Sequence, residues 1–102
     1  MKMEQFYERF DKECMDIPIF NYFDSYQIFQ RLTCASNEDV VIIKERLIKR
    51  AEQHPELIEP EKENMRLLRM MISDYIKGKD TTIKTVILKG VIDDLGKVYN
   101  LT

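Results

Sequence analysis

Apolar residues recur at intervals of three and four along most of this chain, and this spacing places side chains on one face of an α-helix. Three such stripes follow one another from position 40 onward. The first consists of Val40, Ile43, Leu47 and Ala51. The second consists of Met65, Leu68, Ile72, Tyr75 and Ile76, and the third of Ile83, Ile87, Val91, Leu95 and Val98. A chain with this repeated pattern is expected to fold as packed helices.

The length and the turn residues restrict the fold further. With 102 residues, the chain is long enough for one hydrophobic core and too short for two. It contains only three glycines and three prolines, whereas all-β sandwiches and barrels need many tight turns. We therefore predict an all-α fold: a single small helical bundle of four to five helices that occupies residues 1–102 as one domain.

The N-terminal third contains two predicted helices. The first covers residues 3–15 and ends before Pro18, because the residue that precedes a proline avoids the α conformation. The second lies within residues 19–34, in one of two forms. It is either one helix opened by Pro18, or a short turn followed by a helix that Asp24 or Ser25 caps. The apolar spacing favours the second form.

The middle of the chain contains two further helices with a connection between them. Ser36 precedes an acidic residue and an apolar run, a pattern typical of a helix N-terminus, and the helix is expected to continue to about Gln53. Residues 55–63 carry four glutamates and two prolines and are predicted to form an exposed connection. Pro60 suits the first turn of the helix that follows.

The last element is predicted to begin after a stop at Gly78, a residue that accepts positive φ. Asp80 is expected to cap it, and it runs from Thr81 to about Tyr99. The β-branched residues of 81–88 would also suit a strand. Helix is favoured because no turn signal and no partner strand follow this segment.

The first residues and the apolar runs of the sequence predict where in the cell the protein is found. The first residues are polar and lack the apolar segment of a secretory signal. No apolar run approaches the length of about 18 residues that crosses a bilayer. We therefore expect a cytoplasmic protein. Its two cysteines, Cys14 and Cys34, lie on apolar stripes and are expected to be small buried thiols.

Motifs for catalysis and for metal or cofactor binding are missing from the sequence. The single histidine, His54, lies at a predicted helix end, where a cation is favourable without any catalytic role. No Glu precedes it by three positions, as bundle metal sites require, because Ala51 is there. The three glycines are isolated and form no phosphate-binding loop. We therefore predict no enzymatic activity, no cofactor and no metal.

The aromatic residues point to a function in protein binding. Eight of the ten lie within the first 29 positions, so a helix there would be apolar nearly all round and must be buried or face a partner. We predict a non-enzymatic protein-binding module, such as a small adaptor, inhibitor or regulatory factor. The predicted contact residues are Tyr22, Phe23, Tyr26 and Phe29, with Glu56, Glu59 and Glu61 as an electrostatic guide.

Two further predictions concern other partners. The apolar surface exceeds what one small core covers, so we expect self-association, most simply as a two-fold homodimer. The alternative function is that of a helical DNA-binding regulator. Its candidate phosphate contacts are the cations of the helix over residues 38–53, namely Lys44, Arg46, Lys49 and Arg50. The net charge of −2 and the acidic connection after this helix favour a protein partner.

Overall fold

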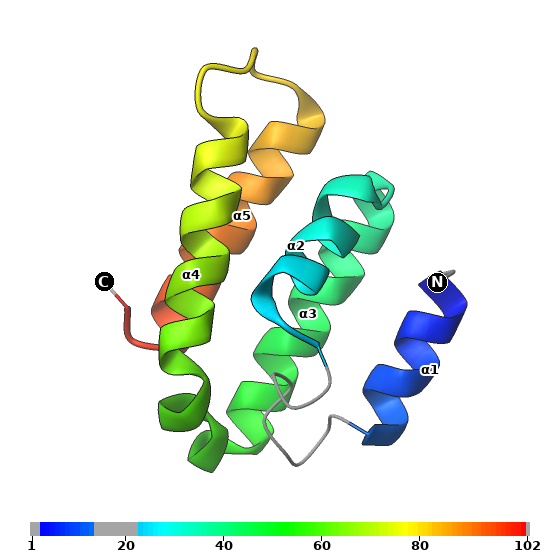
Figure 1. The fold of residues 1–102 in the computed structure, drawn as a ribbon, viewed down its shortest axis with the longest axis vertical. Helices are drawn as coiled ribbons and strands as arrows, with labels where there is room; N and C mark the ends of the chain where they lie inside the picture. The colour runs from blue at the N-terminus through cyan, green and yellow to red at the C-terminus, as the bar shows by residue number, and fades with distance from the viewer. Residues whose placement is uncertain (1–2, 14–22, 102) are drawn as a thin grey trace.

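The computed structural model describes residues 3–13 and 23–101, which form five α-helices and one short 3₁₀ helix (Figure 1). In chain order these are α1 (Met3–Glu13), α2 (Ser25–Cys34), α3 (Asn37–Gln53), η2 (Pro55–Leu57), α4 (Ile58–Ile76) and α5 (Ile83–Val98). There is no strand within these two ranges. The prediction of an all-α bundle is confirmed, and residues 83–98 form the helix rather than the strand.

The three longest helices run side by side in alternating directions (Figure 1). Helix α5 packs against α3 and α4, and α2 packs against α4 and α3. The loop of residues 77–82 joins α4 to α5 at one end of the bundle, which we name the loop end. The turn between α3 and α4 lies at the opposite end, which we name the junction end. Helix α1 stands at the edge of the bundle beside α3.

The core is lined by the stripes that the sequence predicts, with one displacement. The predicted residues of α3 are all buried, as are Met65, Leu68 and Ile72 of α4. In α5 the buried face consists of Leu88, Val91, Leu95 and Tyr99. It is therefore displaced by one position from the predicted face, because Leu88 and Tyr99 replace Ile87 and Val98. Ile83 was predicted to belong to this face and is instead 70% exposed, because it begins α5 at the loop end.

Local capping explains where two of the helices begin. The carboxylate of Asp24 accepts the backbone N–H of Gln27, and the Gln27 side chain accepts the Asp24 N–H, which is a complete capping box. The turn-then-helix form of residues 19–34 is therefore confirmed from Asp24 onward. Ser36 caps α3 through the N–H of Asp39, also as predicted. The predicted end of the first helix, after Glu13, lies outside the described residues.

Two predicted boundaries were wrong. Residues 55–63 do not form a connection, because they belong to η2 and to the first turns of α4. Pro60 lies in the first turn of α4, where a missing N–H leaves no hydrogen bond unmade. Asp80 does not cap α5. Thr82 does, because it directly precedes Ile83 and forms a capping box with Thr85.

Candidate functional site

Three aromatic rings from two helices form a continuous series on the surface, which we name the aromatic row: Tyr26, Phe29 and Tyr75. The ring centroids of Tyr26 and Phe29 lie 6.2 Å apart on α2. The Phe29 ring meets the Tyr75 ring of α4 edge to face, with centroids 5.8 Å apart. Such edge-to-face pairs stabilise each other beyond the area they bury. The two helices therefore hold the row in one fixed arrangement.

The aromatic row is open to solvent at its α2 end. Tyr26 is 56% exposed, whereas Phe29 and Tyr75 are half-buried. The start of α2 is tied to α4, because the hydroxyl of Ser25 donates to the backbone carbonyl of Asn64 at 3.0 Å. An exposed aromatic ring on a fixed support is the arrangement that protein-binding surfaces favour.

The other end of the row terminates at a lysine. The Lys79 Nζ lies 4.6 Å from the centroid of the Tyr75 ring, within the range of a cation–π contact. Gly78, immediately before it, has φ +75° and ends α4, as a glycine can at little steric cost. The glycine thus turns the chain so that Lys79 lies back over the helix it has just left.

An open groove of about 470 Å³ adjoins Lys79 at the loop end. We name it the cationic groove, and it is lined by Ile76, Lys79, Thr81, Thr85, Val86 and Lys89. The side chains of Ile83 and Val86, at the start of α5, are exposed. The Thr82–Thr85 capping box fixes this first turn of α5. The aromatic row and the cationic groove therefore form one surface, because Lys79 lines the groove and also lies over the Tyr75 ring of the row.

The predicted aromatic contact residues divide between core and surface. Tyr22 lies outside the described residues. Phe23 is buried at 4% exposure, where its ring lies 5.1 Å from that of Phe6 and beneath the Arg9 guanidinium. Phe23 is therefore a core residue in this fold. Tyr26 and Phe29 lie on the surface together, and Tyr75 joins them.

The three predicted acidic residues do not form one surface. Glu56 and Glu59 are exposed, in η2 and the first turn of α4. Glu61 has no exposed surface and lies in the core. It therefore cannot guide a partner by its charge. Its burial follows from the position of Glu61 on the inner face of α4, four residues before the buried Met65.

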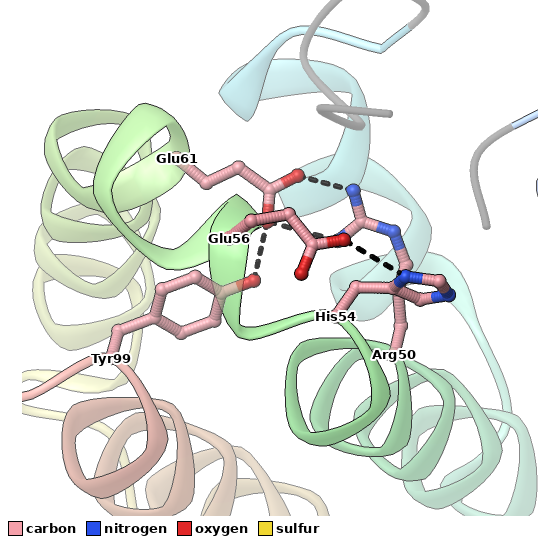
Figure 2. A network of polar contacts seen from close by, with 5 residues as sticks. All are labelled: Arg50, His54, Glu56, Glu61 and Tyr99. Carbon is pink, nitrogen blue, oxygen red and sulfur yellow. Dashed lines mark hydrogen bonds and ion pairs between the residues drawn. The ribbon is translucent and has the colours of Figure 1, made fainter. Parts of the chain in front are cut away.

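Glu61 belongs to a buried ionic cluster with Arg50 and Tyr99 (Figure 2). The Arg50 Nη1 donates to the Glu61 Oε1 at 2.9 Å, and its Nη2 donates to the other carboxylate oxygen. The Tyr99 hydroxyl donates to Oε1 at 2.6 Å. These residues come from the end of α3, the start of α4 and the end of α5. The cluster joins the three long helices at the junction end.

The pKa values of Tyr99, in the cluster, and of Glu56, in the nearby turn, differ from their ordinary values. Burial, and then the charge of Glu61, raise the pKa of Tyr99 well above its ordinary value. Beside the cluster, the His54 Nδ1 lies 3.1 Å from the Glu56 Oε1 (Figure 2). The backbone N–H of Glu56 itself, and then His54, lower the pKa of Glu56. The contact between His54 and Glu56 is exposed, as polar contacts at helix ends commonly are.

The four cations predicted for DNA binding are mostly engaged within the protein. Arg50 is buried with Glu61. Lys44 pairs with Asp94 at 3.1 Å. Arg46 forms a two-point pair with Asp11 and lies 4.3 Å from the Tyr7 ring centroid. Lys49 is exposed. The four side chains therefore do not project together as one basic face.

Several residues of the surface were missed from the sequence. Tyr75 was expected on the buried side of α4, and Lys79 and Lys89 were not singled out. The signal that was present is one of charge, because residues 77–89 contain four lysines and one aspartate. In a chain of net charge −2, this local excess marks the loop end.

Potential metal ligands do not cluster in the described residues. Within residues 3–13 and 23–101, no group of three histidine, cysteine, aspartate or glutamate side chains is placed to hold a metal ion. Cys34 is a free thiol and is exposed, which corrects the expectation that it is buried; it lies in the last turn of α2, on the solvent side. Cys14 lies outside the described residues. None of the helices formed by the described residues combines the length and apolarity needed to cross a bilayer.

Comparison with known proteins adds no relative. No family model, no curated protein and no solved structure matches this chain.

Proposed function

We propose that this chain is a non-enzymatic protein-binding module whose contact surface is the aromatic row. The observation that carries the proposal is the exposed ring of Tyr26 at the open end of a packed series of rings. A side chain that is already held in place loses little conformational entropy when a partner covers it. Aromatic side chains of this kind supply much of the binding energy at protein interfaces.

The contacts of the basic residues support a protein partner over DNA. Lys44, Arg46 and Arg50 already pair with carboxylates of the same chain. A phosphate group would have to displace these partners, and Arg50 would also have to leave the core. Counterion release, which supplies most non-specific DNA affinity, requires cations that are free to meet phosphates.

Capture of partners from the source cell tests the proposal with a matched pair of variants. Tyr26→Ser removes the exposed ring of the row, at 56% exposure. Met70→Ser removes an apolar side chain of similar exposure, 58%, which lies on α4 and does not belong to the aromatic row. We expect Tyr26→Ser to lose the captured protein at least about tenfold and Met70→Ser to retain it. Equal capture by Tyr26→Ser and the unaltered chain would overturn the proposal, provided that both show the same helical circular dichroism.

The homodimer stays a second proposal, beside the binding of a different protein. The exposed apolar side chains that support it include Ile83 and Val86 in addition to Tyr26. Light scattering after size exclusion measures the mass directly. A mass of twice 12.2 kDa that falls to the single value in Tyr26→Ser would identify the row as the dimer contact. The single mass at all concentrations would exclude the dimer and leave a different protein as the partner.

A further inference from the structure

The cationic groove differs in charge from three other grooves formed by the described residues. Its only charged lining residues are Lys79 and Lys89. The groove beside α1 combines Arg46 and Lys49 with Asp11 and Glu45. Carboxylates are therefore built into that groove, and none lines the cationic groove.

Two further grooves show the same contrast. One combines Lys97 with Glu52 and Asp94. The other is lined by Arg66 and Arg69, but both guanidinium groups already have partners. Arg66 pairs with Glu63, and the Arg69 Nε donates to the backbone carbonyl of Ile92 at 2.9 Å. The cationic groove is thus the one of these four whose charged side chains all lack an ionic partner.

The lysines of the loop end lack acidic partners. Within the part of the chain that the structure describes, Lys77, Lys79, Lys84 and Lys89 form no ion pair. Lys84 donates instead to the backbone carbonyl of Ala35. Asp74, Asp80 and Asp93, the acids that lie near these lysines in the sequence, are exposed and form no ion pair with them. The ammonium groups of Lys79 and Lys89 are therefore not engaged by a carboxylate of the described residues.

We propose that the partner of the aromatic row is an acidic segment of another protein that combines carboxylates with apolar side chains. This inference rests on the proposed function and names the chemistry of the partner. The ammonium groups of Lys79 and Lys89 bind carboxylates at the cationic groove, and Ile76 and Val86 contact apolar side chains beside them. Lys79 makes the groove continuous with the row, because it also lies over the Tyr75 ring.

The same surface suits a nucleic acid less well. The rings of the aromatic row are packed against one another, and the face of Tyr75 is already covered by Lys79, whereas single-stranded nucleic acids need open ring faces for stacking. The side chains that project beside the lysines are the aliphatic Ile83 and Val86. Aliphatic side chains next to unpaired cations match an amphipathic acidic peptide.

The test uses the full chain and a defined probe, a synthetic helical peptide with glutamates along one face and leucines along the other. A second peptide has glutamine in place of every glutamate. Binding is followed by amide chemical-shift changes in nuclear magnetic resonance spectra. We expect the glutamate peptide to shift residues 26–29 and 75–89 and the glutamine peptide to bind at least about tenfold more weakly. Equal affinity for the two peptides, or shifts confined to the junction end, would overturn the inference.

Charge-reversal variants provide the second measurement. Lys79→Glu with Lys89→Glu removes the two groove cations, and Lys49→Glu with Lys97→Glu makes the same change in charge at two exposed lysines elsewhere. We expect only the first pair to lose the peptide by at least about tenfold, with unchanged circular dichroism. Equal losses in both pairs would show a response to net charge alone and contradict a specific groove. Binding of an oligothymidine in place of the peptide would identify a nucleic acid as the ligand and also contradict it.

The same variants separate this inference from the proposed function. In capture from the source cell, loss of the partner in Tyr26→Ser but not in Lys79→Glu with Lys89→Glu retains the aromatic row and overturns the acidic partner. Retention of the partner in both overturns the proposed function itself. Loss in both, with retention in Lys49→Glu with Lys97→Glu, supports the two together.

Discussion

The guanidinium group of Arg50 and the carboxylate of Glu61 form a two-point pair in the interior of the bundle, where neither side chain is exposed. Each residue comes from a charged stretch of sequence, one basic and one acidic. The hydroxyl of Tyr99 also donates to the carboxylate. No buried side-chain polar atom of the described residues lacks a hydrogen-bond partner, so the pair is accommodated without an unsatisfied group.

Replacing Glu61 by glutamine should destabilise the protein strongly. The substitution keeps the volume but removes the negative charge that pairs with Arg50 in the core, a loss of about 3–5 kcal/mol in the free energy of unfolding. Urea unfolding followed by far-ultraviolet circular dichroism measures it. The double variant Arg50→Met with Glu61→Leu serves as the control, because an apolar pair needs no counter-charge and should recover most of the loss. A Glu61→Gln midpoint equal to that of the unaltered chain would show that the pair is not as buried as described.

The raised pKa of Tyr99 predicts a loss of stability at alkaline pH. In the unfolded chain a tyrosine loses its proton near pH 10, whereas burial and then Glu61 raise the folded pKa above that value. Above about pH 10 the folded state binds more protons than the unfolded state, so the free energy of unfolding falls as pH rises. The urea midpoint measured between about pH 8 and pH 11 should fall less steeply in Tyr99→Phe. Parallel slopes in the two proteins would contradict the prediction.

Two glycines of α5 should respond oppositely to substitution by alanine. A methyl group at Gly90 would meet no atom within 4 Å, so Gly90→Ala should stabilise the protein by about 0.5–1 kcal/mol through helix propensity. A methyl group at Gly96 would lie 2.6 Å from the Arg69 Nη2. It would displace the guanidinium that donates to Ile92, so Gly96→Ala should destabilise the protein. Thermal unfolding of both variants measures whether each substitution raises or lowers the stability. A gain in stability at both positions would show that the Arg69 side chain moves freely.

Removal of the Arg46 side chain should loosen α1 without unfolding the bundle. Arg46 pairs with Asp11 and lies over Tyr7, and the Tyr7 hydroxyl donates to the Asp39 carboxylate at 2.8 Å. We expect Arg46→Ala to speed amide hydrogen exchange in residues 3–13 while α3 to α5 stay protected. Lys49→Ala, on the same helix and exposed, is the control and should leave the exchange unchanged. Uniformly faster exchange in all helices would show that α1 belongs to one cooperative unit with the rest.

The helices could be predicted because their signals are local. Apolar spacing, the Ser36 cap and the stop at Gly78 each lie within a few residues of the feature they determine. Burial of charge could not be predicted in this way. Arg50 resembles its basic neighbours and Glu61 its acidic ones until the helices pack and bring the two together. Only the folded chain shows which charges are internal.

The aromatic prediction divided for the same reason. Phe23 and Tyr26 are three positions apart in the sequence, yet one packs beneath Phe6 and the other reaches solvent. Which side of the segment is covered depends on α1, and the contact of Phe6 with Phe23 is not encoded by any local spacing. Tyr75 joins the surface through Phe29, across two helices, and the Phe29–Tyr75 contact likewise depends on tertiary packing.

The buried pair also restricts how the helices can slide along one another. Most side chains of the core are aliphatic, and one of them can replace another at modest cost when helices shift. A shift of α4 by one helical turn, about 5.4 Å, would separate the Glu61 carboxylate from Arg50 and break this buried pair. The pair therefore selects a single axial alignment of α3 and α4 out of those that the aliphatic residues would permit. This alignment also sets the position of Tyr75 along the axis of the bundle. It thereby sets the point at which the Phe29 ring contacts α4.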